Sequence, residues 1–174
     1  MIKNLFIATC LFLSVVSFAQ QGTSSPYSFY GIGDVRYKGT AEIRSMAGIA
    51  VEQDSIHLNI DNPASYANLK LTTFSLGGSY NTTKLQSSSI TEDARRPTLD
   101  YLAVGLPLGK LGVGFGLIPY SSVGYQIQSL SSADGGVNRR YDGSGGLNKA
   151  FLGAAYKISP KFSLGADVNY NFGT

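Results

Sequence analysis

The chain has 174 residues, of which 21 are glycine, 11 are tyrosine and 9 are phenylalanine, and it has no tryptophan. Charged residues make up only 14% of the chain, well below the roughly 25% of an average globular domain, and the net charge of +3 gives no indication of nucleic-acid binding. Few charges at a mean hydropathy near zero suit strands with one face to lipid and one to water. A soluble β-sandwich is the competing class that composition leaves open.

Residues 1–19 have the pattern of a secretory signal peptide. Lys3 supplies the positive charge, residues 5–16 form an apolar run, and Ala19 ends a small-x-small cleavage site, so we expect the mature chain to begin at Gln20. The run is shorter than the roughly 20 apolar residues that a membrane-spanning helix needs. Cys10, the only cysteine, could instead be a lipid acceptor. That alternative is disfavoured because only a short apolar run precedes it.

Residues 20–69 show no sustained strand period and are predicted to form a hatch or plug segment. Within them Asn62-Pro63-Ala64 predicts the start of a short helix, because Asn is favoured before the first helical turn and Pro within it. We place this motif at the junction between hatch and barrel. His57 is the only histidine and lies in the same irregular part, away from any partners for a catalytic triad or a zinc site. We therefore expect no enzyme activity, no metal and no cofactor.

The rest of the chain, residues 70–174, alternates apolar and polar side chains, which is the pattern of β-strands. Five segments carry the alternation: 72–82, 99–107, 111–118, 148–157 and 162–172. In the last of them Leu164 and Val168 point one way, and Asp167 and Asn169 point the other. Each segment is long enough for a tilted strand to cross a bilayer.

The connections alternate between short and long, as they do in outer-membrane barrels. Tight turns are expected at 107–110 and 158–161, and long polar loops at 84–98 and 121–146. Several tyrosines near strand ends fit the aromatic girdles of such barrels: Tyr101, Tyr120, Tyr125 and Tyr156. Together these features predict an all-β fold, a transmembrane antiparallel β-barrel in the cell outer membrane, surrounded by outer-membrane lipids and lipopolysaccharide.

Two smaller patterns have competing interpretations. Gly112-x-Gly114-x-Gly116 looks like a phosphate-binding loop, but the glycines alternate with apolar residues inside a strand. We therefore expect them to form a small inward face that leaves room for another segment. Each long connection also holds an arginine pair, Arg95-Arg96 and Arg139-Arg140. Those pairs are interpreted as solvated loop charge, with contact to lipopolysaccharide phosphates as the alternative.

Several short stretches together resemble one known family. They are Met46-Ala-Gly-Ile-Ala-Val, Asp61-Asn62-Pro63-Ala64-Ser65 before Thr72-Thr73-Phe74, Val104-Gly105-Leu106-Pro107, and the run from Gly114 to Tyr125. The opening from Ser25 to Asp34 adds to them. These stretches resemble the FadL/OmpP1/TodX family of outer-membrane transport proteins, in a form typical of Bacteroidota, over nearly all of the mature chain.

That resemblance implies a barrel of about fourteen strands, plugged by an N-terminal hatch, that passes hydrophobic small molecules such as long-chain fatty acids. Residues 20–69 would be the hatch. The alternative is a barrel that interacts with secretion-machinery proteins, like the shuttle component of type IX secretion. Five strands are too few to close a barrel, so we expect the sequence to be the N-terminal part of one.

Overall fold

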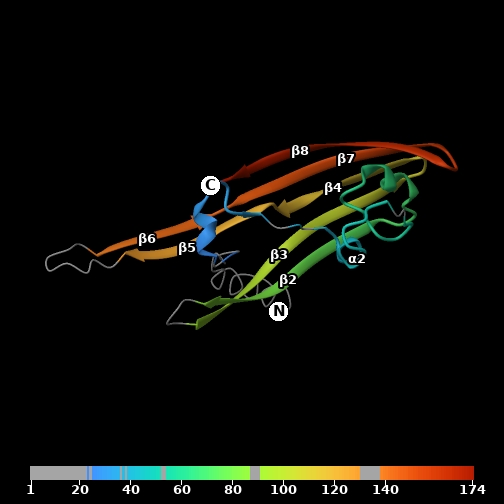
Figure 1. Ribbon diagram of the computed structural model, residues 1–174. Coiled ribbons are helices and arrows are strands. Elements are labelled where there is room, and N and C mark those ends of the chain that lie inside the picture. Colours follow the sequence, from blue (N-terminus) through green and yellow to red (C-terminus); the bar gives the residue numbers. More distant parts are fainter. Residues whose placement is uncertain are drawn as a thin grey trace, which may run out of the picture.

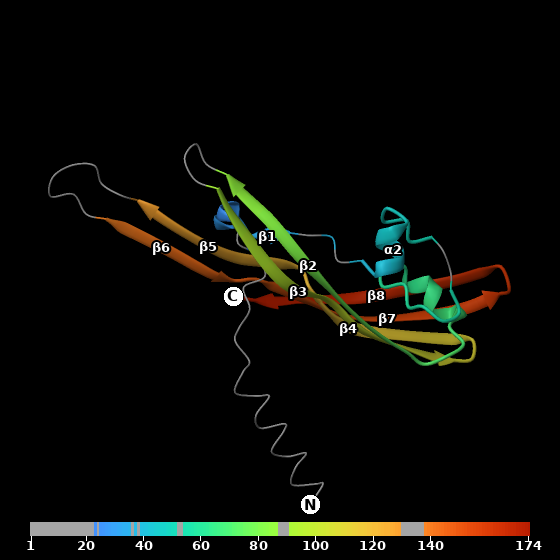
Figure 2. The same ribbon diagram turned by 90° about the horizontal axis from the view of Figure 1, so that it is seen from below.

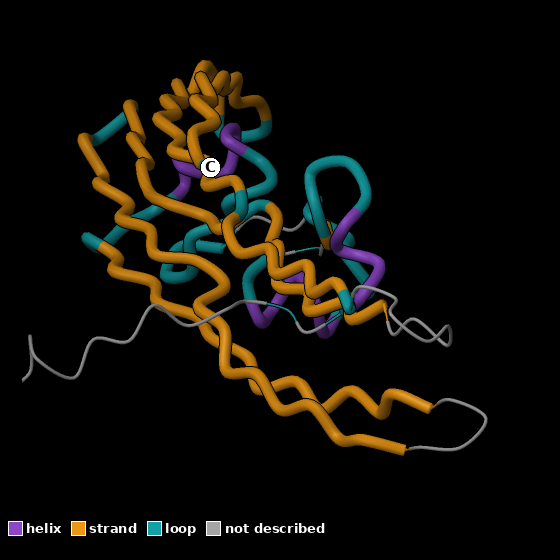
Figure 3. The backbone as a smooth tube through the Cα atoms, turned by 90° about the vertical axis from the view of Figure 1, so that its left-hand side faces the viewer, coloured by secondary structure: helices purple, strands orange, loops and turns teal. Residues whose placement is uncertain are grey.

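The computed structural model describes residues 23, 25–35, 37, 39–51, 54–86, 91–129 and 138–174. The predicted signal peptide, with its cleavage site between Ala19 and Gln20, lies outside the described residues. Most of the described chain is strand, and the helical turns are short and few (Figure 3). The prediction of an all-β, antiparallel fold is confirmed.

The larger sheet has five strands in the order β2-β3-β4-β7-β8, each antiparallel to its neighbour (Figure 1). Its members are β2 (Thr73–Gln86), β3 (Thr91–Leu108), β4 (Leu111–Pro119), β7 (Leu147–Ser159) and β8 (Phe162–Gly173). These are the five segments predicted from the alternation. Both predicted tight turns are also present, and Gly109 takes the positive φ of 75° in the first of them, a conformation that glycine adopts without strain.

A smaller sheet has the order β1-β5-β6 and consists of β1 (Asp34–Val35), β5 (Ser121–Ser129) and β6 (Arg139–Gly145). A single residue separates the end of β4 from the start of β5, and a single residue separates the end of β6 from the start of β7. The smaller sheet therefore extends the middle of the larger one, and the β5–β6 hairpin diverges from the β2–β3 hairpin (Figure 2).

The prediction of two long polar loops is wrong. Strands β2 and β3 continue in register to Gln86 and Thr91, and β5 and β6 pair as far as Ser129 and Arg139. The outer part of the β2–β3 hairpin carries mainly polar or charged side chains on both faces, as at the rung of Lys84 and Asp93, and none of those described is buried. An apolar period therefore cannot reveal that hairpin. Strand β5 does alternate Val123, Tyr125 and Ile127 with glycine and glutamine, and the interpretation of this stretch as a loop missed that signal.

The described part of the N-terminal segment holds three short helices: η1 (Pro26–Phe29), α2 (Ala41–Ser45) and η2 (Pro63–Asn68). Helix α2 begins after Thr40, whose hydroxyl accepts a hydrogen bond from the backbone N–H of Ile43 at 3.4 Å, a standard cap for the first turn. None of the helices in the described residues is long and apolar enough to span a membrane.

The hydrophobic core lies between this segment and one face of the larger sheet. The segment contributes Leu58, Ile60, Tyr66, Ala67 and Leu69, and the sheet contributes Tyr101, Ala103, Ile118, Phe151 and Ala155. Tyr101 is therefore buried under the N-terminal segment, and its predicted place in an aromatic girdle is wrong. The described strands form two open sheets, and they do not close into a barrel.

Candidate functional site

The larger sheet has one uncovered face that is apolar across all five strands. One row of directly opposed residues crosses the whole sheet on this side: Phe74, Val104, Phe115, Leu152 and Val168. Leu152 is 60% exposed and Val168 is 74% exposed. Soluble monomers seldom leave a contiguous apolar patch of this extent in water. We call this surface the apolar face.

The opposite side, which we call the covered face, carries small and polar residues together with the sheet's part of the hydrophobic core. Its neighbouring row reads Thr73, Gly105, Gly114, Gly153 and Asp167. A Cβ atom at Gly114 would lie 2.7 Å from the Tyr66 ring, and one at Gly112 would overlap the Tyr66 carbonyl oxygen. The prediction that the glycines leave room for another segment is confirmed for Gly112 and Gly114, where Tyr66 fills the space, while a Cβ atom at Gly116 would instead overlap the Leu102 carbonyl oxygen of β3.

A buried ion pair joins α2 to this covered face. Nη1 of Arg44 donates to Oδ2 of Asp100 at 2.8 Å, and the Asp100 side chain is 1% exposed. The hydroxyls of Ser79 and Thr98 donate to its other oxygen at 3.0 and 3.3 Å. The pairing register of β2 and β3 shifts at this point, because Gly77 pairs with Tyr101 and Gly78 pairs with Leu99.

The shift is a β-bulge, and it explains why Asp100 and Tyr101 both lie buried although they are adjacent in sequence. The Tyr101 hydroxyl accepts a hydrogen bond from the backbone N–H of Ala41 at 3.3 Å. Sequence reasoning missed this pair of contacts to α2. Strict alternation allows only one of two adjacent residues on a given face, so no periodic signal could have found them.

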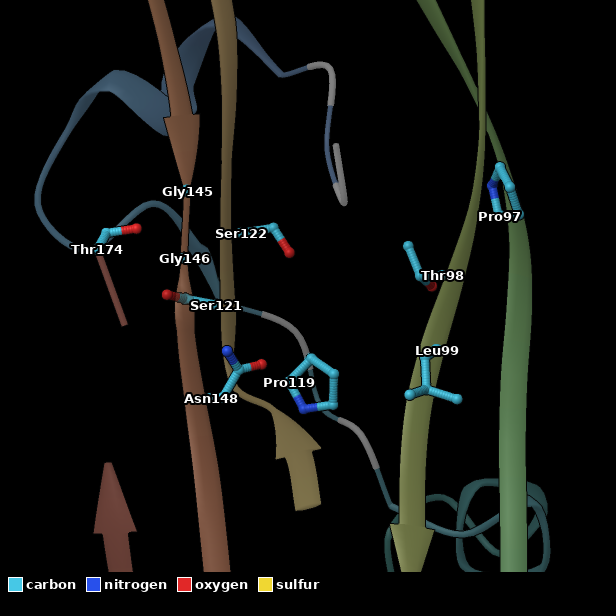
Figure 4. Close-up of a pocket in the computed structure, with 10 residues that line it drawn as sticks. All are labelled: Pro97, Thr98, Leu99, Pro119, Ser121, Ser122, Gly145, Gly146, Asn148 and Thr174. Atoms are coloured by element: carbon cyan, nitrogen blue, oxygen red, sulfur yellow. The ribbon is translucent and has the colours of Figure 1, made fainter. Parts of the chain in front are cut away.

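Where the two hairpins diverge, the sheet opens into a cleft that we call the seam. Strand β3 pairs with β4 only from Leu102 onward. Beyond that point a cavity of about 420 Å³ separates Pro97, Thr98 and Leu99 of β3 from the bend between β4 and β5. Figure 4 shows these three residues on one side of the gap and Pro119, Ser121 and Ser122 on the other, with the Ser121 side chain turned away from β3.

The predicted junction motif begins a helix as expected, but by a different mechanism. Helix η2 starts at Pro63, and Asn62 makes no side-chain cap. Nδ2 of Asn62 instead donates to the carbonyl of Ala50 at 3.1 Å. A Cβ atom at Gly165 of β8 would overlap the backbone N of Ala64. The motif therefore lies against β8, and its role as a hatch-to-barrel junction stays a prediction.

His57 pairs with Asp54 at the surface. This hydrogen bond raises the pKa of His57 above its ordinary value and lowers the pKa of Asp54. Elsewhere in the N-terminal segment, burial and a 2.6 Å hydrogen bond to Asp61 raise the pKa of the Tyr37 hydroxyl to about 12. In the described part of the chain no three His, Cys, Asp or Glu side chains are placed to hold a metal ion.

The comparisons with known proteins identify the family. The family model for BamG matches residues 1–174. The chain belongs to the BamG family. BamG is a family of lipoproteins of the BAM complex for outer-membrane assembly, so the chain is associated with the outer membrane and with proteins of that complex. No curated protein and no solved structure matches the chain.

Membership in the BamG family corrects several predictions. The resemblance to FadL-type transporters was wrong, and so was the inferred transport of hydrophobic small molecules. The type IX secretion alternative is also unsupported. The motifs behind that resemblance are short, and most of them lie on strands or on the segment packed against them. Alternating glycine and apolar residues occur in the strands of many unrelated barrels, so such motifs do not identify one family. Outer-membrane localisation was predicted correctly.

Proposed function

We propose that this BamG-family chain takes part in outer-membrane protein assembly as a membrane-embedded subunit of the BAM complex. Its apolar face contacts lipid, and residues 70–174 form part of the wall of a transmembrane β-barrel. Residues 20–69 fold as a hatch against the covered face, with Asn62, Pro63 and Ala64 at the junction. The chain binds and positions other proteins and has no catalytic role of its own.

The apolar face is the observation that carries the membrane part of this proposal. Burying one large apolar side chain is worth about 1.5–3 kcal/mol. No side chain in the row from Phe74 to Val168 is buried: each is either half-buried or exposed. In water, the protein would lack on the order of 5–10 kcal/mol of the stabilisation that burial of this row would give. Lipid removes this cost, and the polar backbone of the hatch then meets the covered face, away from lipid.

Two adjacent residues of β8 provide a matched test. Val168 lies on the apolar face opposite Leu152, and Asn169 lies on the other face opposite Phe151. Both side chains are exposed in the structure. In water, arginine at either position would cost little. In a bilayer, Val168→Arg should cost about 2–4 kcal/mol while Asn169→Arg should be tolerated.

The experiment replaces the natural protein by each variant in cells and measures two quantities. One is the amount of the variant that co-purifies with BAM subunits from detergent-solubilised outer membranes, and the other is the steady-state level of outer-membrane barrel proteins. We expect Val168→Arg to lose both and Asn169→Arg to keep both. Equal behaviour of the two variants would contradict membrane embedding. Normal levels of barrel proteins after depletion of the chain would contradict the role in assembly.

A further inference from the structure

The apolar face ends at a definite level on the β2–β3 hairpin. On β3 the apolar side chains of this face run from Leu108, at the tight turn, to Pro97. About ten residue steps separate the two once the bulge residue is left out. At about 3.3 Å per residue and a strand tilt of about 40°, these steps rise about 25 Å, which is the height of the apolar band of an outer-membrane barrel.

Strand β8 gives the same height independently. Its side chains on the apolar face run from Phe162, beside the other tight turn, to Phe172, again about ten residue steps. Aromatic residues lie at both ends of this row, and at the far end Tyr170 and Phe172 stack with ring centroids 5.9 Å apart. Aromatic rings at both ends of an aliphatic row are the pattern of the girdles that flank a lipid-facing band. The two strands therefore agree on the height of the hydrocarbon layer.

Charged side chains begin directly beyond this level, on the same side of the β2–β3 hairpin. The opposed pairs along that side read Tyr80 with Pro97, Thr82 with Arg95, and Lys84 with Asp93. All six residues are exposed. A tyrosine followed by cations is the order expected where a lipid-facing strand leaves the hydrocarbon and enters the headgroup layer. Two cations stand against one anion there, so this group carries a net positive charge.

The structure separates the two members of the Arg95-Arg96 pair. Arg95 is exposed on the side of the apolar face, where it forms no ion pair with a described residue. Arg96 lies opposite Asn81 on the other side of the strand, and its Nε is buried. Only Arg95 therefore faces the lipid at the level of the headgroups.

We infer that Arg95, with Lys84 beside it, binds a phosphate group of lipopolysaccharide in the outer leaflet. The short turns mark the periplasmic end of the strands, so the end that carries Arg95 lies at the outer surface, whose phosphorylated lipid is lipopolysaccharide. A guanidinium donates two parallel hydrogen bonds to a phosphate, and Thr82 provides a hydroxyl on the same rung. This inference rests on the proposed membrane embedding and names the lipid class at one end of the apolar face.

Photo-crosslinking in cells tests the inference with two adjacent threonines. Thr82 lies opposite Arg95 on the lipid side, and Thr83 lies opposite Ala94 on the other side. A photoreactive amino acid replaces one or the other in the full chain, and adducts are detected with antibodies to the chain and to lipopolysaccharide. We expect Thr82 to give several-fold more lipopolysaccharide adduct than Thr83. Equal yields at the two positions would overturn the inference.

The probe at Thr82 also measures the contribution of each arginine. Arg95→Gln should lower the adduct yield several-fold, and Arg96→Gln should leave it unchanged because Arg96 lies on the opposite side. Arg95→Lys should restore part of the yield, since an ammonium keeps the charge without the two parallel donors. Co-purification of BAM subunits verifies that each variant has assembled. An unchanged yield in Arg95→Gln, or an equal fall in Arg96→Gln, would refute the assignment of Arg95.

Vesicles separate lipopolysaccharide from other lipids. The BAM complex with the probe at Thr82 is reconstituted in phosphatidylcholine vesicles that contain lipid A (the phosphorylated anchor of lipopolysaccharide), dephosphorylated lipid A or phosphatidylglycerol, in equal amounts. We expect the highest yield with lipid A. An equal yield with dephosphorylated lipid A would overturn recognition of the phosphate, and an equal yield with phosphatidylglycerol would overturn the assignment to lipopolysaccharide.

A probe on the apolar face distinguishes failure of this inference from failure of the proposed function. Val168 lies in the middle of the apolar row of β8, so a photoreactive amino acid there should crosslink phosphatidylcholine in all three kinds of vesicle. If Val168 gives no lipid adduct, the proposed membrane embedding fails together with this inference. If Val168 gives the adduct and Thr82 shows no preference for lipid A, only this inference fails.

Discussion

The buried ion pair between Arg44 and Asp100 offers the sharpest test of how the N-terminal segment is held. Removing one partner of a fully buried pair typically costs about 3–5 kcal/mol. The Arg44 side chain is 33% exposed, and the hydroxyls of Ser79 and Thr98 would still donate to Asp100. We therefore expect Arg44→Met, which keeps the aliphatic stem, to cost about 2 kcal/mol of local stability.

Hydrogen exchange measures this loss of local stability at α2 itself. The amide of Gly48 donates to the Ile43 carbonyl at 2.8 Å, and that of Met46 donates to Glu42 at 3.2 Å. Both amides exchange only when α2 opens, so their rates report the free energy of opening. A loss of about 2 kcal/mol should accelerate their exchange by roughly 30-fold, since about 1.4 kcal/mol corresponds to a factor of ten.

The matched control is an ion pair of the same length at the surface. Arg140 and Asp142 of β6 also lie 2.8 Å apart, but their side chains are 57% and 49% exposed. Exposed pairs contribute about 0–1 kcal/mol, so Arg140→Met should change exchange in the β5–β6 hairpin by only a few-fold. If Arg44→Met accelerates exchange at α2 no more than Arg140→Met does in its own hairpin, burial of Asp100 does not hold α2 in place.

Three further outcomes follow from the sequence and the structure. Gly112→Ala should destabilise the fold by about 3 kcal/mol in chemical unfolding, because the added methyl group overlaps the Tyr66 carbonyl oxygen; an unchanged midpoint would contradict the close approach. The pKa of His57, followed by NMR, should lie above 6.5 and should fall toward 6.5 in Asp54→Asn. The charged His57 therefore stabilises the fold fully below 6.5, and this contribution is lost as the pH rises through the raised pKa of the folded protein. The cleavage between Ala19 and Gln20 stays a prediction: mass spectrometry should find Gln20 at the mature amino terminus, whereas a lipid on Cys10 would show that the chain is processed as the lipoproteins of its family are.

The sequence by itself determined the five strands of the larger sheet and the identity of their two faces. Leu164 and Val168 were assigned to one face and Asp167 to the other from the period of two alone, and the structure has them so. This succeeded because side chains alternate along any strand, whatever lies on either side of it. The glycines at 112 and 114 were assigned to a close approach for the same local reason.

Tertiary structure alone decided the features on which the proposed site depends. The bulge at Asp100 breaks the period, and the pairing of Lys84 with Asp93 extends a hairpin that has no apolar face to reveal it. The seam exists because the chain after Pro119 forms hydrogen bonds with β7 and with the distant residue Ile32. Each of these depends on contacts between segments far apart in sequence, and local periodicity holds no information about such contacts.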